Sequence, residues 1–598
     1  MKKFNAFLYL IFLTLSNTLC AGNSPWTDWR NYTTGSLMYG DGKSYIDQPY
    51  VVKLTNGRWF CVATIGSCES CKDRHICSFW SDDKGKTWSE SVNTEPGDGT
   101  QASWVSPYLT SFGRIYIVYN FNGDVVDVEK NTRAQLFCFR YSDDNGNTWS
   151  ERYNLPVRLT ACDEGKNYFK GWGIDKPKLI NGSVFFAYTK TSSPLGGEGW
   201  VFNSPNLNTE KEVDKLVWNM LPDGEKGIRN EAFGNHQEEH NLVGLSNNSI
   251  YCIYRTDNGY LAHSYSRDLG KSWSLPVVAT YEPDGTQIIK CPRANTNMWK
   301  CCNGKYLMWF HNHGGARESK MKYHPQSKKE YPAPNRNPVW ITGGIEKNGM
   351  IFWSQPEILL YDEDYEKYTH SGGYTGFSYP DLIEEDGNYW ITETEKKQAR
   401  IHAVDPTLFE GLWNQRSNKT LTKVGLSIEK KDVKKGGVLI KMPTVASLVD
   451  GGFTIEMLAS FDELKEGQIL FDSRNESKKG ILLETSEKNS LKITICDGLL
   501  STSWASDSCL LQIKKDYHFA FIVDGGPNII SVVVDGKLCD GGKNNRQGWG
   551  RFQTKLENVN GNATAIVGKS VNVNVKQFRL YNRYLRTSET IANYNSIK

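Results

Sequence analysis

The sequence has almost no excess of charge of either sign and, beyond its first 22 residues, no long apolar run. Its 70 lysines and arginines balance 67 aspartates and glutamates, which leaves a formal net charge of +3 over 598 residues. So small a charge does not favour binding to nucleic acid, which calls for a strongly basic surface. The lack of a later apolar run excludes a transmembrane helix. We therefore expect neither a nucleic-acid partner nor a transmembrane segment.

The N-terminal segment MKKFNAFLYLIFLTLSNTLCAG combines two lysines, a short apolar stretch and small residues near its end. That order is typical of a secretory signal peptide, and the apolar stretch is too short to span a membrane as a helix. We predict that residues 1–21 are a signal peptide and that the mature protein is secreted and extracellular.

The 14 cysteines are distributed unevenly, and four of them lie within a short segment: Cys61, Cys68, Cys71 and Cys77. Cys68 and Cys71 form a C-x-x-C pair, which suits zinc or redox chemistry as well as a disulfide. In an exported protein, disulfides are favoured. Two further groups are interpreted in the same way: Cys301 with Cys302, and Cys496 with Cys509 and Cys539. No metal and no other cofactor is predicted.

An eight-residue phrase occurs three times in the first half of the chain. It reads SDDKGKTW at 81–88, SDDNGNTW at 142–149 and SRDLGKSW at 266–273. The starts are 61 and then 124 residues apart, which indicates a unit of about 62 residues with one copy missing. The missing copy is expected near residue 204, where Ser204, Asn206 and Trp218 remain although the glycine is absent.

The phrase has the chemistry of a hairpin turn. The aspartates Asp83, Asp144 and Asp268 can accept hydrogen bonds from backbone amides, and the glycine two positions later supplies the positive φ of a chain reversal. Alternating runs such as RIYIVYNF, SVFFAYTK and SIYCIYRT lie between the copies and predict strands. Several strands per unit of this length are typical of a β-propeller. We predict an all-β, six-bladed propeller within residues 22–415.

The repeat fades near residue 415, and a second β-pattern begins near residue 441. Between them, the polar, lysine-rich residues 416–440 are interpreted as a linker. Alternating runs such as FTIEMLASF, GILLETS and YHFAFIVD predict a two-sheet jelly-roll sandwich over 441–598. The hairpin VVVDGKLCDGG and the string FRLYNRYL resemble the laminin-G and concanavalin-like lectin family. Such a module can bind a glycan or brace an enzyme, and both roles stay open.

The three octets resemble the Asp-boxes of the sialidase superfamily, where they are structural. Four further residues stand in the family's order. Glu239 opens EHNLVGL and Arg255 follows sixteen residues later, Arg336 precedes the strand VWITGGI, and Tyr379 stands in SYPDLIEEDGNYW. The resemblance implies an exo-glycosidase with Tyr379 as nucleophile, Glu239 as its base, and Arg255 and Arg336 as substrate-binding residues.

The same roles are chemically reasonable without the family. A phenol has a pKa near 10 and is a weak nucleophile until a neighbouring carboxylate accepts its proton. The forked guanidinium of an arginine binds a carboxylate or sulfate through paired hydrogen bonds.

The resemblance fails at the first blade. Sialidases begin that blade with Arg-Ile-Pro, whose arginine helps to bind the substrate carboxylate, whereas this sequence has Asp47-Gln48-Pro49. A carboxylate at this position repels an anionic group, so we expect feeble cleavage of ordinary sialosides and an altered sugar specificity. The resemblance also implies an acidic proton donor ahead of the first octet. Asp73, in the cysteine-rich loop, and Asp47 are the two candidates.

Three functions stay open. The favoured one is an exo-glycosidase that acts on terminal sugars of glycans or glycoconjugates. The second is a non-catalytic glycan-binding protein that has lost the first arginine and serves adhesion. The third is a propeller lyase that acts on an acidic polysaccharide, with tyrosine and histidine as base and acid.

Overall fold

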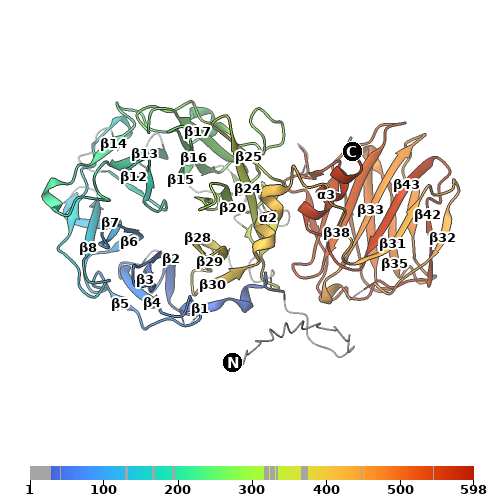
Figure 1. Ribbon diagram of the computed structural model, residues 1–598, viewed down its shortest axis with the longest axis horizontal. Coiled ribbons are helices and arrows are strands. Elements are labelled where there is room, and N and C mark those ends of the chain that lie inside the picture. The colour runs from blue at the N-terminus through green and yellow to red at the C-terminus, as the bar shows by residue number, and fades with distance from the viewer. Residues whose placement is uncertain are drawn as a thin grey trace, which may run out of the picture.

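The computed structural model describes residues 28–40, 42–69, 71–127, 132–163, 169–191, 196–315, 322–323, 330–331, 335–364, 375–445, 447–542 and 545–598. The predicted signal peptide, residues 1–21, lies outside these ranges. Figure 1 shows two bodies side by side: a ring of antiparallel sheets, blue to yellow, and a sandwich of sheets, orange to red. No helix in the described ranges is long and apolar enough to cross a membrane.

The ring is a β-propeller built from six sheets of four or five strands in the described residues. The first three blades are β2 (Tyr45–Lys53), β3 (Trp59–Gly66), β4 (His75–Ser81) and β5 (Val92–Asn93); β6 (Ala102–Leu109), β7 (Ile115–Asp127), β8 (Thr132–Ser142) and β9 (Tyr153–Asn154); and β10 (Gly171–Trp172), β11 (Lys178–Ile180), β12 (Ser183–Lys190), β13 (Glu198–Ser204) and β14 (Asn219–Leu221).

The other three blades are β15 (Gln237–Gly244), β16 (Ile250–Thr256), β17 (Leu261–Ser266) and β18 (Val277–Val278); β19 (Asn297–Lys300), β20 (Tyr306–Phe310), β24 (Val339–Lys347), β25 (Met350–Trp353) and β26 (Glu357–Leu360); and β28 (Ser378–Glu385), β29 (Asn388–Thr394) and β30 (Ala399–Val404) with β1 (Ser36–Tyr39). Because β1 pairs with β30, a strand from near the N-terminus completes the last blade and closes the ring. Two short pairs lie outside the blades: β21 (Lys322–Tyr323) with β22 (Glu330–Tyr331), and β23 (Asn335–Arg336) with β27 (Thr375–Gly376).

Four first strands of blades, β2, β6, β15 and β28, share one irregularity. In each, the register with the second strand shifts, and one non-glycine residue takes a positive φ: Gln48 (53°), Trp104 (57°), Glu239 (59°) and Tyr379 (46°). A β-bulge of this kind turns a side chain away from the regular alternation of the strand. Left-handed non-glycine residues are uncommon and gather at functional sites.

The repeated octets form the turns between the third and fourth strands of their blades. In the first, Asp83 Oδ1 accepts hydrogen bonds from Thr87 N (2.9 Å) and Ser81 Oγ (2.8 Å), and Ser81 Oγ accepts from Gly85 N (2.8 Å). The segment predicted as a degenerate copy connects β13 to β14. There Asn206 Oδ1 accepts from Val217 N at 3.0 Å, as the aspartate does in the intact octets.

The second body is a β-sandwich. One sheet holds β31 (Leu426–Lys431), β43 (Val573–Tyr581), β33 (Phe453–Phe461), β38 (Tyr517–Asp524), β39 (Ile529–Val534), β40 (Lys537–Leu538) and β41 (Trp549–Arg551). The other holds β32 (Val438–Lys441), β42 (Thr564–Val567), β34 (Ile469–Asp472), β35 (Gly480–Ser486), β36 (Ser490–Cys496) and β37 (Ser501–Ala505). Their inner faces share one apolar core. The resemblance of this region to lectin families stays a prediction.

The predicted linker, 416–440, is wrong in part, because it contains β31 and the start of β32. β31 lies at the edge of its sheet, paired with β43, and its side chains are mostly exposed. Lysines are common on exposed edge strands, where their charge opposes pairing with other chains. Its charge therefore reflects an edge position and not a flexible connection.

The prediction of several disulfides is also wrong for most of the described cysteines. Cys68 and Cys71 form a disulfide, whereas Cys61, Cys77 and the later groups Cys301/Cys302 and Cys496/Cys509/Cys539 are free. Cys61 and Cys77 are buried in neighbouring strands, where cysteine packs as a small apolar residue. The described residues hold no group of three or more His, Cys, Asp or Glu side chains that could bind a metal ion.

Helix α2 (Pro406–Asn414) lies between the two bodies, and helix α3 (Thr587–Ser596) ends the sandwich (Figure 1). Apolar side chains of both bodies join one cluster, in which Trp340 and Trp353 of the propeller pack with Ile522 and Trp549 of the sandwich. Arg30 adds a buried ion pair across the boundary, to Asp524 at 2.7 Å. The two bodies therefore form one continuous unit.

The second octet gives a test of the turn. Asp144→Ala removes the acceptor of Thr148 N (2.9 Å) and of the Ser142 and Thr148 hydroxyls. We expect the free energy of unfolding to fall by about 1–2 kcal/mol, because the backbone amide and the two hydroxyls lose their shared acceptor. Denaturant unfolding measures the effect, and a variant as stable as wild type contradicts a structural role of the turn.

The pH dependence follows from the same contacts. Although partial burial works the other way, the hydrogen bonds from Thr148 and Ser142 lower the pKa of Asp144. The contribution of the Asp144 carboxylate to the free energy of unfolding is thus fully present at pH values above the ordinary pKa of aspartate, and it is lost as the pH falls below that pKa. The difference in stability between wild type and Asp144→Ala should shrink in acid.

Candidate active site

Tyr379 and Glu239 meet at the ring axis through their bulges. The Tyr379 hydroxyl donates a hydrogen bond of 2.7 Å to Glu239 Oε1, and both side chains are buried. Burial, followed by the negative charges of Glu239 and Asp47, raises the pKa of Tyr379 well above 10. The phenol is therefore protonated at neutral pH, and the carboxylate that receives its hydrogen bond is positioned to accept its proton.

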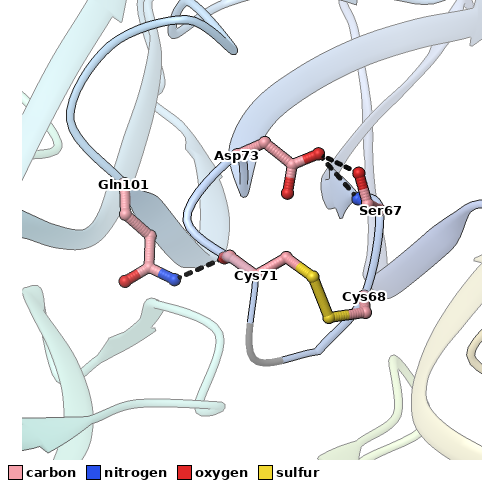
Figure 2. The surroundings of a disulfide bond; sticks show 5 residues. All are labelled: Ser67, Cys68, Cys71, Asp73 and Gln101. Carbon is pink, nitrogen blue, oxygen red and sulfur yellow. Dashed lines mark hydrogen bonds between the residues drawn. A yellow bond between two sulfur atoms is a disulfide. The ribbon is translucent and has the colours of Figure 1, made fainter.

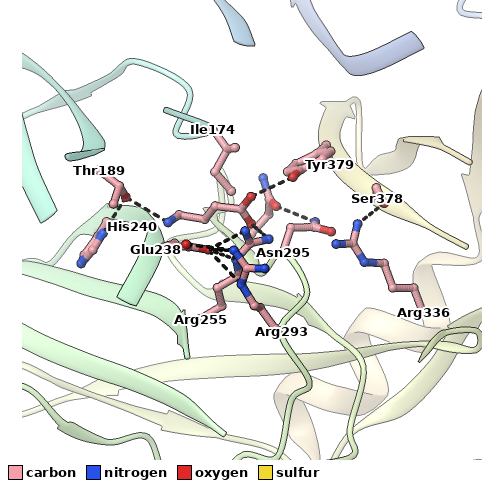
Figure 3. Close-up of polar contacts among 12 residues, drawn as sticks. Ile174, Thr189, Glu238, His240, Arg255, Arg293, Asn295, Arg336, Ser378 and Tyr379 are labelled. Carbon is pink, nitrogen blue, oxygen red and sulfur yellow. Dashed lines mark hydrogen bonds and ion pairs between the residues drawn. The ribbon is translucent and has the colours of Figure 1, made fainter. Parts of the chain in front are cut away.

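Arg255 orients the Glu239 carboxylate from the other side. Its NH1 lies 2.7 Å from Glu239 Oε2, and its NH2 lies 2.8 Å from Glu238 Oε2. Arg293 binds Glu238 as well, at 2.9 Å. Burial alone would raise the pKa of Glu238, but the charges of Arg293 and Arg255 lower it to about 2. Figure 3 shows both guanidiniums converging on this carboxylate.

Arg336 joins the site from β23. Its guanidinium carbon lies 6.0 Å from the centre of the Tyr379 ring, and its NH1 donates a hydrogen bond to Ser378 Oγ. Arg336 is buried. The structure thus brings together the four residues that the sequence motifs indicated: Tyr379, Glu239, Arg255 and Arg336.

Asp47 is buried beside the same group, but it is not an isolated negative charge. Its Oδ2 accepts hydrogen bonds from Tyr45 OH (2.7 Å) and Lys396 Nζ (2.9 Å). Burial raises the pKa of Asp47 despite the opposing charge of Lys396. Lys396 Nζ also lies 4.4 Å from the centre of the Tyr379 ring. This lysine stands in no sequence motif; it comes from the last blade, between β29 and β30, and places a positive charge beside Asp47 of the first blade.

The cysteine-rich loop carries two acidic residues with different surroundings. Asp73 Oδ2 accepts hydrogen bonds from Ser67 N (2.9 Å) and Ser67 Oγ within the loop, and the bond from the Ser67 hydroxyl lowers its pKa (Figure 2). Glu69, between the two bonded cysteines, has Oε1 3.7 Å from Lys396 Nζ, and 41% of its side chain is exposed. Asp73 is therefore engaged in a turn, whereas Glu69 borders the Asp47–Lys396 pair.

Two of the other residues at the site lie beside positions that the sequence singles out. Glu238 precedes Glu239 in the polar cluster NHQEEH, where the sequence assigns it no role, and Glu69 lies inside the C-x-x-C pair. Arg293 and Lys396 stand in no motif. Only the closing of the ring brings them to the site, so the sequence alone does not indicate them.

Comparison with known proteins gives one relative of known activity by sequence. No family model matches the chain. A sialidase of Clostridium perfringens is 24% identical over 329 residues, which cover 52% of this chain and 78% of that protein. Together with the blade topology and the octets, this similarity supports a sialidase-superfamily fold and homology to a glycoside hydrolase.

Solved structures of low sequence identity were also found. The Trypanosoma rangeli sialidase in complex with 2,3-difluorosialic acid, a covalent intermediate, is 13% identical with a TM-score of 0.42, over 93% of this chain and 94% of that one. A Hadza microbial sialidase is 15% identical with a TM-score of 0.43, over 62% of this chain and 68% of that one. A Dyadobacter fermentans protein of unknown function is 14% identical with a TM-score of 0.43, over 62% and 98%.

Glu238 offers a test of the buried charge network. Glu238→Gln removes the counter-charge that Arg255 and Arg293 share, so we expect the free energy of unfolding to fall by about 3 kcal/mol. Because the folded pKa is about 2, lower than about 4.3 in an unfolded chain, this contribution is present above that value and disappears as the pH falls toward 2. Denaturant unfolding at several pH values measures it. The exposed Glu225→Gln is the matched control and should be neutral at every pH.

Proposed function

We propose that the protein is a secreted glycoside hydrolase that removes terminal sugars from glycans, with Tyr379 as nucleophile and Glu239 as its base. The observation that carries the proposal is the 2.7 Å hydrogen bond from the buried Tyr379 hydroxyl to Glu239. A tyrosine nucleophile is a recognised exception among glycoside hydrolases, most of which use two carboxylates. Homology to a sialidase supports glycans as the substrate class.

The reaction follows from these positions. The Tyr379 oxygen attacks the anomeric carbon as its proton passes to Glu239, while a proton donor protonates the leaving oxygen and the glycosidic bond breaks. In the second step, water attacks the same carbon as the bond to Tyr379 breaks; the water gives one proton to the former donor, and the phenol oxygen regains its proton from Glu239.

Glu69 suits the role of proton donor better than the two aspartates that the sequence suggested. Asp73 is held in its turn by Ser67, which favours the charged form of the carboxylate. Asp47 holds Lys396 and Tyr45 through one oxygen. Glu69 is partly exposed and lies on a loop closed by the Cys68–Cys71 disulfide. The ammonium group of Lys396 lies between Glu69 and the Tyr379 ring, 3.7 Å from Glu69 Oε1 and 4.4 Å from the ring centre.

The charges favour an altered sugar specificity over that of a strict sialidase. Among the described residues, the named cations and carboxylates of the site are equal in number: Arg255, Arg293, Arg336 and Lys396 against Asp47, Glu69, Glu238 and Glu239. The carboxylates offset the attraction of the cations for an anionic sugar. Such a sugar therefore gains less electrostatic attraction here than it would at a site of three arginines without carboxylate partners. Arg255 and Arg336 still provide donors for an acidic or hydroxyl-rich group.

The nucleophile is tested by Tyr379→Phe and Glu239→Gln, assayed on fluorogenic aryl glycosides and on mixed glycans. We expect each variant to lose at least about 10³-fold in kcat, because the phenol oxygen or its proton acceptor is gone.

The released sugars also identify the class of reaction. An unsaturated product would establish a lyase, and binding without any released sugar would establish a lectin.

The proton donor is tested by Glu69→Gln on substrates with different leaving groups. An aryl glycoside leaves readily without a proton, whereas a disaccharide does not. We therefore expect a loss of at least about 10²-fold on the disaccharide and a much smaller loss on the aryl substrate. Asp73→Asn is the matched control and should not distinguish the two substrates. Equal losses on both substrates in Glu69→Gln would exclude Glu69 as the donor.

A further inference from the structure

The bulge of the first blade presents two buried oxygens without hydrogen-bond partners, Asp47 Oδ1 and Gln48 Oε1. Asp47 is 1% exposed and Gln48 is fully buried. Buried polar atoms in folded proteins are nearly always paired. These two stand on the strand that corresponds to the strands of Glu239 and Tyr379 in the other blades. Unpaired acceptors at this position indicate a place for a hydrogen-bond donor that comes from outside the chain.

Lys396 keeps Asp47 Oδ1 unpaired. Lys396 Nζ and Tyr45 OH both bind the other oxygen, Oδ2, at 2.9 and 2.7 Å. Lys396 is itself fixed, because its N–H donates to Thr394 Oγ1 (2.8 Å) and its carbonyl accepts from Ile46 N (3.0 Å). The carboxylate cannot rotate to pair Oδ1 without breaking its two existing bonds.

The Asp47–Lys396 pair lies beside the nucleophile. Lys396 Nζ is 4.4 Å from the centre of the Tyr379 ring, and Glu69 Oε1 is 3.7 Å from the same nitrogen. A sugar whose anomeric carbon is attacked by Tyr379 therefore carries its substituents close to Asp47. An ionised carboxylate can only accept hydrogen bonds, so it attracts a hydroxyl or ammonium group and repels an anionic one.

We propose that Asp47, held in place by Lys396, is a specificity-determining residue that accepts a hydrogen bond from a hydroxyl or ammonium group of the terminal sugar. The inference rests on the proposed hydrolase function and deepens it. It defines the substrate class as glycosides whose terminal sugar presents a donor at the position where sialidases bind a carboxylate through their first arginine.

A double-mutant cycle tests the proposal. The 4-methylumbelliferyl glycosides of sialic acid, of its deaminated 5-hydroxy counterpart and of galactose are assayed first, and the best substrate is then compared with its monodeoxy analogues. In wild type, removal of one particular hydroxyl should lower kcat/KM by about 10- to 100-fold, the range for a hydrogen bond to a charged group. In Asp47→Ala, removal of the same hydroxyl should have almost no effect.

Tyr45→Phe is the matched control, since it removes one partner of Oδ2 and leaves Oδ1 and Lys396 in place; it should keep the wild-type response. If Asp47→Ala fails to fold, Lys396→Met with the same analogues replaces it and should lose the discrimination. Equal responses of wild type and variant to every deoxy analogue would overturn the proposal while leaving the hydrolase function intact. Failure of wild type to cleave any of the three glycosides would instead count against the hydrolase function, and the inference would fall with it.

Discussion

Closing six sheets around one axis requires their first strands to lie close together, and the bulges in those strands decide which side chains meet there. The left-handed residues Glu239 and Tyr379 form the hydrogen bond between the proposed base and the proposed nucleophile. Two residues beyond each bulge, the chain is tied to the next blade: Asp381 Oδ2 accepts from Val51 N (2.8 Å), and Asn241 Oδ1 accepts from Met298 N (2.9 Å). The packing that closes the ring therefore also positions the two groups that we propose to react, which suits chemistry that depends on accurate placement.

The electrostatics of the site follow from this confinement. Burial raises the pKa of the Tyr379 phenol and favours its neutral form, so the proposed attack requires that its proton be transferred at the same time. Arg255 binds Glu239 Oε2 and leaves Oε1 directed at the phenol. Asp47 stands where the resemblance to sialidases leads one to expect an arginine, and the ammonium group of Lys396 compensates its negative charge. A lysine of the last blade, between β29 and β30, thus places a cation near Tyr379, the proposed nucleophile, and it is paired with the carboxylate of Asp47.

The features that could be predicted from the sequence are those that short, contiguous segments encode. The octets repeat, the strands alternate, and Glu239, Arg255, Arg336 and Tyr379 stand in recognisable strings. Lys396 could not be predicted, because it lies 349 residues from its partner Asp47 and in no motif. The lysines of β31 suggested a linker, since an exposed edge strand and a solvated connection have the same composition. The free cysteines show that an expected export from the cell is not enough to predict disulfides, since a disulfide also requires two cysteines whose sulfurs can meet.

The position of the sandwich bears on the choice between bracing and glycan binding that the sequence left open. Besides the shared apolar cluster, Trp549 Nε1 donates to Asn312 O (3.0 Å), and Arg551 NH2 donates to Asn337 O (2.7 Å). Asn337 directly follows Arg336, whose guanidinium faces the Tyr379 ring. The sandwich therefore stabilises the backbone beside Arg336, which we propose to bind substrate. This direct link to the site favours bracing as one role of the second body, because a module that only bound glycans would need no contact beside Arg336.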